Sequence, residues 1–381
     1  MKLRGFWKAL LLTVLTLAVA AGSLYYMAEP IKELFYSTGA VTLEHHDVTM
    51  NAAVVDRYTM YMNNRISSVL DGVVAIEKKY WLSDDDLVAP QPKQENYGTY
   101  ANAGAMASFL TEAETVLAGQ ETFFTTTTSV HPQTKVLTYL DETIMVITWK
   151  ESIQNIMYTF SEVKIVDPSQ FRRFLTGGTY GSELRMTTSE MAQSVNAVMA
   201  SSGDFYSHRQ WGICVYNGRV YRVNPYLDTC FVDEGGNLLF QKGFTIRTME
   251  DAQKFVDENN VRFSLAFGPI LIQNGEPVRT DSYIVGEIDK EHVRAALCQL
   301  DELHYLVITA NHDDRLMACL VPDNLSMFQR HLLNRGIQNA YCLDGGQTAV
   351  IVHNNEVINA VEFGAQRQIS DIIYFATAMP G

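Results

Sequence analysis

The segment from Ala340 to Val352 places one carboxylate, Asp344, between an apolar run and two glycines. The apolar residues predict a buried strand, and Gly345 and Gly346 allow the backbone to turn sharply or to approach a ligand closely. Asp344 would then lie at a strand end facing a cleft, where a carboxylate can take part in acid–base chemistry. The alternative interpretation is an Asp-Gly hairpin turn, and the spacing alone favours neither.

Three further segments combine glycines with polar residues where strands should end. Ser201–Tyr206 follows a predicted helix, and taken alone it is interpreted as a turn. In Phe267–Pro269 the proline fixes the backbone and the glycine allows close approach. In His292–Arg294 the guanidinium could clamp an anion, whereas a lone histidine is more often a surface or hydrogen-bonded residue. A fourth polar segment, Gly364–Asp371, follows the Asp344 segment.

The composition is that of an ordinary globular protein, with 381 residues, 47% hydrophobic and 19% charged. This length can hold one large or two medium domains. The net charge of -14 and the pI near 5.1 argue against sequence-independent binding of nucleic acid, which needs a surplus of Lys and Arg on one face. An anionic substrate would have to be met by a local cluster of arginines.

The N-terminal segment predicts membrane insertion. Lys2, Arg4 and Lys8 precede an uncharged apolar stretch, Ala9–Ala28, and about 20 such residues can span a bilayer. The preceding positive charges would keep the N-terminus in the cytoplasm and place the rest outside. Ala18–Ala20 could instead be a signal-peptide cleavage site, but the stretch is longer than a usual signal sequence, which favours an uncleaved anchor. Either interpretation predicts an extracytoplasmic body.

The cysteines do not form a recognisable framework. Five of them, without CxxC spacing, are too scattered for a metal site or a disulfide scaffold. Cys214 and Cys230 lie close enough in sequence to pair in an oxidising compartment, and the odd total would leave at least one free thiol or an intermolecular bond. The acidic run Asp84–Asp86 is interpreted as a solvated loop rather than a metal site.

Hydrophobic periodicity predicts many short strands and few helices. Helices are expected over 51–76, 103–117, 168–175, 188–199, 251–259 and 322–335. Strands are expected over 135–139, 143–149, 212–216, 219–223, 265–272, 305–309 and 318–321, and from 341 to 344. Asn217-Gly218 is a strong hairpin signal, and a second hairpin is expected at Asn237. The close spacing of the strands indicates an α+β fold with a mixed sheet rather than an alternating doubly wound sheet.

Together these segments resemble the phosphodiester glycosidase family, over roughly Ser161 to Ala376. The family's motifs appear in order as Ser202–Tyr206, Gly268-Pro269 followed by Asn274-Gly275, His292–Ala296, Cys342–Ala349 and Arg367–Asp371. Each motif is weak alone, but five in the right order are specific. The sequence departs from the family pattern at four positions, where Ser202 and Cys342 each replace an Asn, Gln347 a Gly and Ala349 a Ser. Loss of the amide donors points to weakened or altered activity as an alternative.

The resemblance implies hydrolysis of the bond between a sugar's anomeric carbon and a phosphodiester. It implies that Asp344 and Asp204 supply the carboxylates, one as base or nucleophile and the other orienting sugar hydroxyls, with His292 a weaker candidate as acid or phosphate ligand. Phosphate or substrate binding is expected from a larger set: Arg294, Arg367, Gly345, Gly346, Thr348, Gly203, Gly268 and Asp371. No cofactor is required, although a divalent cation near the phosphate is a further expectation.

The expected organisation has three parts: a cytoplasmic N-terminus and transmembrane anchor over 1–40, a membrane-proximal accessory domain over 41–154, and a phosphodiester glycosidase-like domain over 155–381. From this location we expect a substrate among envelope polymers or exopolysaccharides that carry sugar phosphates. The rival hypotheses are a polysaccharide-binding or assembly protein that has lost the chemistry, and a purely structural domain in which both aspartates are turn residues.

Overall fold

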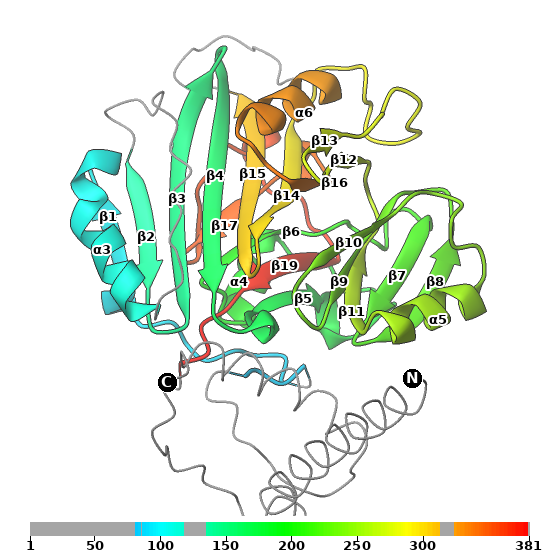
Figure 1. Cartoon of the computed structure of the whole chain (residues 1–381), viewed down its shortest axis with the longest axis horizontal. Coiled ribbons are helices and arrows are strands. Elements are labelled where there is room, and N and C mark those ends of the chain that lie inside the picture. Colours follow the sequence, from blue (N-terminus) through cyan, green and yellow to red (C-terminus); the bar gives the residue numbers. More distant parts are fainter. Residues whose placement is uncertain (1–80, 85, 118–134, 313–323, 380–381) are drawn as a thin grey trace, which may run out of the picture. The chain divides into compact units, whose positions relative to one another are not determined.

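Antiparallel strands make up most of the structure, and the helices are few and short (Figure 1). The computed structural model describes residues 81–84, 86–117, 135–312 and 324–379. These residues belong to one unit that runs from Tyr80 to Gly381. The predicted combination of many short strands with few helices is confirmed, and the described residues contain more β structure than the expected α+β class suggests. The expected mixed sheet is wrong, because the strand pairs of all four described sheets are antiparallel.

The largest sheet has nine strands in the order β1-β2-β3-β4-β15-β14-β16-β12-β13. Every pair in it is antiparallel, and β3 and β4 are its longest strands. Its strands are β1 (Tyr97–Tyr100), β2 (Val136–Leu140), β3 (Ile144–Ile153), β4 (Ile156–Ile165), β12 (Ile270–Gln273), β13 (Glu276–Pro277), β14 (Arg294–Asp301), β15 (His304–His312) and β16 (Asn339–Leu343).

Three smaller sheets complete the fold. A five-stranded sheet has the order β18-β17-β6-β19-β5, a three-stranded sheet the order β10-β9-β11, and β7 pairs with β8 alone. The first contains β5 (Phe171–Leu175), β6 (Met199–Ser202), β17 (Ile351–His353), β18 (Glu356–Val357) and β19 (Asp371–Phe375). The three-stranded sheet contains β9 (Thr229–Asp233), β10 (Leu238–Gln241) and β11 (Val261–Leu265), and the two-stranded sheet contains β7 (Gly212–Tyr216) and β8 (Arg219–Asn224).

Four α-helices are described, and local sequence signals explain where they begin. They are α3 (Ala107–Val116), α4 (Thr188–Ser194), α5 (Met249–Glu258) and α6 (Leu325–Asn334). Thr187, Thr248 and Asn324 cap the last three by accepting a hydrogen bond from a first-turn amide. Short 3-10 helices lie at η1 (Gln94–Asn96), η2 (Ala103–Met106), η3 (Pro168–Gln170), η4 (Thr176–Gly178), η6 (Gly346–Thr348) and η7 (Glu362–Gly364).

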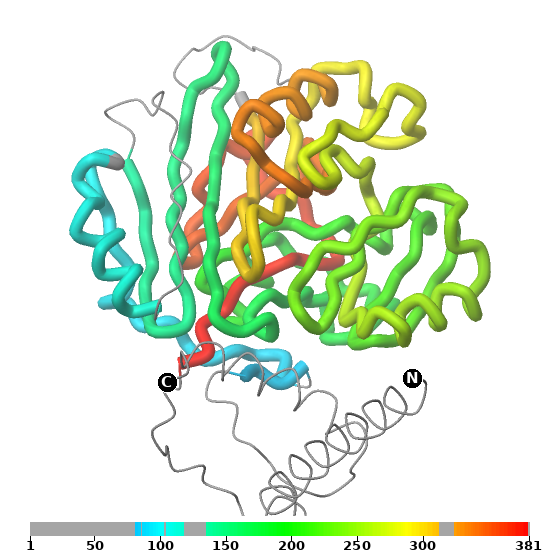
Figure 2. The backbone as a smooth tube through the Cα atoms, viewed as in Figure 1, coloured from blue at the N-terminus to red at the C-terminus, as the bar shows by residue number. Residues whose placement is uncertain are grey.

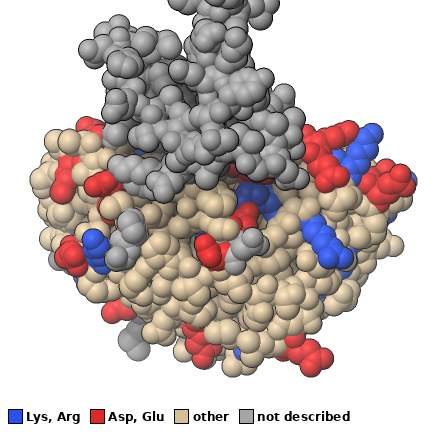
Figure 3. Space-filling model, turned by 90° about the horizontal axis from the view of Figure 1, so that it is seen from below, with Lys and Arg blue, Asp and Glu red and all other residues tan. Residues whose placement is uncertain are grey.

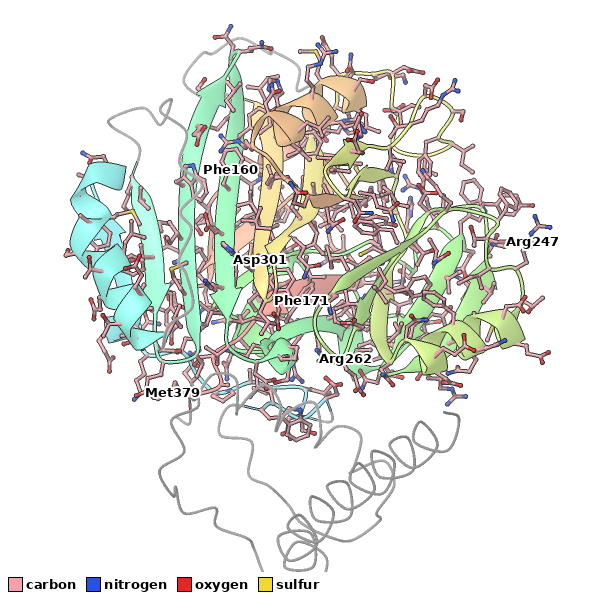
Figure 4. All side chains as sticks on the ribbon, in the orientation of Figure 1. Phe160, Phe171, Arg247, Arg262, Asp301 and Met379 are labelled. Atoms are coloured by element: carbon pink, nitrogen blue, oxygen red, sulfur yellow. The ribbon has the colours of Figure 1, made fainter. Side chains whose placement is uncertain are left out.

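Both faces of the nine-stranded sheet are buried, because side chains alternate between two apolar clusters. On β3, Ile144 and Val146 face a cluster shared with the five-stranded and three-stranded sheets, whereas Met145 and Ile147 face a cluster that contains side chains of α3 and α6. Phe171 lies where the layers meet, and its ring stacks on Phe375 at 4.7 Å between centroids (Figure 4). The nine-stranded, five-stranded and three-stranded sheets therefore share one apolar cluster.

The chain path in Figure 2 places residues of β7 to β11 and α5 in a lobe beside the large sheet. β4 lies between β3 and β15 in the middle of that sheet and pairs with both over its length. The expected boundary at 154 therefore falls in the turn between β3 and β4. Strands β1 to β3 belong to the same sheet as β4, β14, β15 and β16, so the structure does not separate residues 81–153 as a membrane-proximal domain. The part over 41–80 lies outside the described residues.

Several predicted elements are confirmed. Strands lie at 136–140 and 144–153, hairpins form at Asn217-Gly218 and at Asn237, and helices occupy the expected places at 107–116, 249–258 and 325–334. The predicted helix over 51–76 and the strand over 318–321 lie outside the described residues.

Three element predictions are wrong in whole or in part. Residues 168–175 are not helical throughout, because only η3 is helical and the five residues of β5 are buried and pair with β19. The expected strand over 265–272 is interrupted at Gly268-Pro269, where the proline has no N–H to give to a neighbouring strand. The helix expected over 188–199 ends at Ser194, since β6 begins at Met199.

The disulfide that the spacing of Cys214 and Cys230 would allow is not formed. Cys214 and Cys230 are both buried free thiols, as are Cys298 and Cys342. The cysteines of the described chain therefore behave as small apolar core residues, in line with the interpretation that they form no disulfide scaffold.

The predicted membrane location is also corrected. Within the described parts of the chain, no helix is both long and apolar enough to cross a bilayer. The stretch Ala9–Ala28, on which the prediction rested, lies outside the described residues. We therefore withdraw the membrane-anchored location and the topology derived from it.

Candidate functional site around Asp344

Asp344 directly follows β16, which pairs with β14 on one side and β12 on the other. Its carboxyl group is nearly buried, with 12% of the side chain exposed. Burial raises the pKa of Asp344 from 3.8 to about 6, although Arg209, Thr348, Arg367 and the Gly345 amide each pull it down. A nearly buried carboxyl group that still reaches the surface and has a raised pKa is a candidate acid, base or nucleophile.

The glycine pair after Asp344 is required by close backbone contacts. A Cβ at Gly345 would overlap the carbonyl of Val293, and Gly346 has a φ of +63° and donates its N–H to that same carbonyl at 3.1 Å. Thr348 Oγ1 donates to the carbonyl of Gly345 at 2.6 Å. The chain then enters the five-stranded sheet at β17, so this segment crosses between sheets and is not a hairpin turn.

Arg209 lies beside Asp344, with 3.8 Å between Nη1 and Oδ1. Its guanidinium also packs over the ring of Phe267 at 4.9 Å, and 36% of its side chain is exposed. Because the Phe267 ring fixes one face of the guanidinium, the charge is held at the mouth of the Asp344 site while part of it stays accessible. Arg209 thus supplies a cation to which an anionic ligand has access.

Two more cationic or titratable groups gather at the same place. Arg367 packs over the ring of Phe205 at 5.3 Å, and His208 stacks on that ring at 5.0 Å. Burial lowers the pKa of His208, and Arg367 and Arg209 lower it further. The two arginines make a local positive region around Asp344 in a protein whose net charge is -14. On the face shown in Figure 3, by contrast, acidic and basic side chains are interspersed.

His292 borders the glycine turn from the other side. A Cβ at Gly346 would lie 3.0 Å from Glu362 Oε2 and 3.1 Å from His292 Cε1, so both side chains approach this glycine. Burial and Arg294 lower the pKa of His292, while Glu362 and Glu287 oppose this. His292 is therefore neutral near pH 7, with one ring nitrogen a hydrogen-bond donor and the other an acceptor.

Asp204 and Asp371 lie in a separate, fully buried network. Arg173 Nη2 contacts Asp204 Oδ1 at 2.5 Å and Asp371 Oδ2 at 2.9 Å, with no exposed side-chain surface on any of the three. The Ala266 amide donates to Asp204 Oδ2 at 2.6 Å. Burial raises the pKa of Asp204 and the Arg173 cation opposes the rise. The expected role of Asp204 at the substrate is not supported by this geometry, because both of its oxygens are occupied and enclosed.

Gly203 makes this network possible. A Cβ at position 203 would overlap the carboxylate of Asp371, whose Oδ2 accepts the amide hydrogen of Asp204 at 3.1 Å. Gly203 and Asp371 therefore act in the framework that orients the loop carrying Phe205 and Arg209, rather than at a phosphate.

Arg294 and Gly268, both expected to bind substrate, hold loops. The Arg294 guanidinium donates to the carbonyls of Gly286, Glu287 and Lys290, which fixes the segment before His292. At Gly268 the φ is +72° and a Cβ would overlap the hydroxyl of Tyr283. Because these three bonds engage the Arg294 guanidinium with the protein itself, a phosphate clamp at this residue is not supported.

The structure thus divides the predicted residues into two groups. Around Asp344 it brings together Gly345, Gly346, Thr348, His292 and Arg367. In the supporting framework it places Asp204, Asp371, Gly203, Arg294 and Gly268. The sequence interpretation missed Arg209, Arg173, His208 and Glu362. Arg209 follows the Gly203–Tyr206 element by three residues, which is the one signal that could have indicated it.

The two substituted family positions are also enclosed. Ser202 is buried, and its hydroxyl oxygen has no hydrogen-bond partner among the described residues. Cys342 faces the apolar cluster beneath α6, and burial raises the pKa of its thiol to about 12. As for metals, the described residues contain no group of three or more His, Cys, Asp or Glu side chains placed to hold an ion.

Comparison with known proteins identifies the class of this domain. The family model for phosphodiester glycosidases, NAGPA, matches residues 195–376, which include Asp344, Arg209 and Arg367. The chain therefore carries a phosphodiester glycosidase-family domain, and the resemblance inferred from its motifs is confirmed. The matched segment ends where the motif-based resemblance ended and begins later than Ser161.

Individual relatives are distant. The chain is 23% identical over 230 residues to the SPbeta prophage-derived uncharacterized protein YomE of Bacillus subtilis, covering 59% of this chain and 34% of that protein, so it spans about a third of that relative's length. It is also similar to the catalytic domain of zebrafish N-acetylglucosamine-1-phosphodiester alpha-N-acetylglucosaminidase, auto-inhibited by its pro-peptide, with a TM-score of 0.49, 15% identity and coverage of 61% and 82% of the two chains. A hypothetical protein from Synechocystis matches with a TM-score of 0.44 and 12% identity over 63% of each chain.

Proposed function

We propose that this domain hydrolyses the bond between the anomeric carbon of a sugar and a phosphodiester, releasing the free sugar and a phosphate monoester. The observation that carries the proposal is the position of Asp344, a nearly buried carboxyl group bordered by Arg209 and Arg367. The Asp344 carboxyl group can act at the sugar while the two arginines bind the phosphate. The phosphodiester glycosidase family match is consistent with this hydrolase chemistry.

In this mechanism the substrate phosphate lies against Arg209 and Arg367. The C1–O bond breaks, and its electron pair stays on the phosphate oxygen, so the leaving group departs as an anion that the arginines stabilise. The oxygen of a water molecule bonds to C1, and its proton passes to the carboxylate of Asp344. Phosphate is a good leaving group, so no strong general acid is needed.

The pKa of Asp344 suits this role. With a pKa of about 6, the carboxyl group is mostly ionised at neutral pH and is a stronger base than an unperturbed aspartate. Neutral His292 could donate a hydrogen bond to the phosphate or to a sugar hydroxyl from the far side of Gly346. The Arg173, Asp204 and Asp371 network would hold the Arg209 loop in position rather than touch substrate.

The direct test is sugar release from a panel of sugar-1-phosphodiesters, including polymer-bound sugar phosphates such as those of exopolysaccharides. Asp344→Asn should abolish release and Arg209→Gln should reduce it, chiefly by raising KM. Asp281→Asn is the matched control, because Asp281 is an exposed carboxylate paired with Arg279. Equal activity of Asp344→Asn and the control would refute the role of Asp344. Dialysis against a chelator should leave activity intact, since the proposed mechanism uses side chains alone.

A second function is supported by one observation, the enclosure of Asp204. Of the two carboxylates that the family pattern supplies, only Asp344 reaches the surface. This favours a saccharide-binding protein without turnover as the alternative. Wild-type protein that binds sugar phosphates but releases no sugar from any of them would establish it.

A further inference from the structure

Three aromatic side chains form an exposed cluster that begins two residues after Arg209. Trp211, Tyr226 and Phe244 are 40%, 51% and 49% exposed. Tyr226 joins the other two, with ring centroids 6.3 Å from Trp211 and 5.1 Å from Phe244. We call these three residues the aromatic platform. Contiguous large apolar side chains that remain half in water mark interaction sites, whereas scattered single ones do not.

The platform is held rigidly by the backbone around it. Phe244 has a φ of +66°, which is unusual for a bulky residue, and its N–H donates to the carbonyl of Pro225 at 2.6 Å. Arg247 Nε donates to the carbonyl of Phe244 at 2.8 Å, and Figure 4 shows Arg247 at the outer margin of the lobe. A rigid aromatic surface loses little conformational entropy when a ligand packs on it.

The Trp211 end of the platform lies on the same loop as Arg209. Arg222 donates to the carbonyls of Tyr206 and Trp211 at 2.7 and 2.8 Å, so one guanidinium fixes both ends of the loop that carries Arg209. Trp211 follows Arg209 by two residues, which places their Cα atoms within about 7 Å of each other. A phosphate bound at Arg209 would therefore have the Trp211 end of the platform beside it.

We propose that the aromatic platform binds the saccharide on the leaving-group side of the substrate, the part that departs with the phosphate. This inference rests on the proposed function. A pyranose ring has an apolar C–H face with hydroxyls around its edge, so its face packs on aromatic rings while its edge seeks polar groups. Lys242, half exposed and 3.0 Å from Asp228, provides such a group in the turn just before Phe244.

The test compares two substrates that share the sugar and the phosphodiester but differ in the leaving alcohol, one methanol and the other a disaccharide. The readout is the ratio of their kcat/KM values. Trp211→Ala and Tyr226→Ala should each lower the preference for the disaccharide ester about tenfold, an energy of about 1.4 kcal/mol. Leu184→Ala removes a comparably exposed apolar side chain elsewhere and should leave the ratio unchanged.

A binding measurement separates this inference from the proposed reaction. Calorimetric titration with the disaccharide phosphate, the monoester product, requires no turnover. If Trp211→Ala binds the product more weakly than wild type, the platform binds the saccharide, whether or not any substrate is hydrolysed. Absence of hydrolysis would refute only the proposed reaction. Two results would refute the saccharide-binding role of the platform. One is an unchanged ratio of kcat/KM values in an active enzyme, and the other is product binding that neither substitution affects. The exposed aromatic surface would then be assigned to binding a protein partner.

Discussion

Replacing Asp344 by Asn should abolish activity and, at neutral pH, make the protein more stable. The pKa of Asp344 is raised from 3.8 to about 6, so its charged form is less favourable in the folded protein than in the unfolded chain. A group with a raised folded-state pKa contributes stability below its unfolded pKa, and that contribution is lost as the pH rises through the folded pKa. The amide of an asparagine at this position does not titrate, so the variant would be spared this loss.

The size of the effect follows from the two pKa values. A difference of about two units corresponds to about 3 kcal/mol above pH 6, because each unit is worth 1.36 kcal/mol. At pH 4.5 the Asp344 carboxyl group is largely ionised in the unfolded chain but largely protonated in the folded protein. The difference between the two pKa values is then worth only about 1 kcal/mol. The stabilisation should therefore shrink as the pH falls, and at about 2 to 4 °C per kcal/mol it is large enough to measure.

The assay is thermal unfolding of wild type and Asp344→Asn at pH 7.5 and pH 4.5, beside sugar release at pH 7.5. We expect a higher midpoint for the variant, a larger gain at pH 7.5 than at pH 4.5, and no activity. Asp281→Asn, which changes an exposed carboxylate whose pKa Arg279 lowers, should show no such gain. A variant that is destabilised at pH 7.5 would identify Asp344 as a structural turn residue and refute the reasoning.

Three more predictions concern the neighbours of this site. Arg209→Gln should raise the pKa of Asp344 further, by about one unit, because it removes a partly exposed cation 3.8 Å from the carboxylate. The acid limb of the pH profile of kcat/KM should therefore shift to higher pH. Gly203→Ala should cost about 2 kcal/mol or more in urea unfolding, because the new methyl group would overlap the carboxylate of Asp371. Arg173→Met should cost about 3 kcal/mol or more, because it leaves two buried carboxylates without their cation.

Each of these has a matched control. Lys254→Gln removes an exposed charge on α5 and should not move the acid limb; an equal shift would indicate a general charge effect. Gly104→Ala adds the same methyl group where its nearest contact is the Asn102 side chain at 3.2 Å, and should cost less than the change at position 203. Adding Asp204→Asn to Arg173→Met should recover part of the lost stability; no recovery would argue against the charge explanation.

Much of the local structure can be predicted from the sequence, because its causes are local. The Asn217-Gly218 hairpin has positive φ at both turn residues, as its sequence requires, and the caps of α5 and α6 are adjacent to the helices they start. The position of Asp344 at a strand end is a consequence of the apolar run before it. These features depend on residues within a few positions of one another.

The partners within the site could not be predicted in this way. Arg294 has the expected charge in the expected motif, yet its donors are used by the loop just before it, and nothing in its spacing distinguishes a loop clamp from a phosphate clamp. Arg173 lies in a segment predicted as helix, so neither its strand nor its contact with Asp371 could be anticipated. Pairings across about 200 residues are set by the whole fold rather than by local pattern.

The position of β19 has a consequence for how the protein is made. β19 lies between β6 and β5 in its sheet, pairing Phe375 with both Met199 and Phe171. A growing chain on the ribosome therefore presents β5 and β6 long before the strand that joins them exists. Asp371, the second carboxylate for Arg173, arrives with that strand. The framework behind Arg209 is thus completed only after synthesis has passed Phe375, so a partly made chain contains Asp344 before the network that supports the Arg209 loop can form.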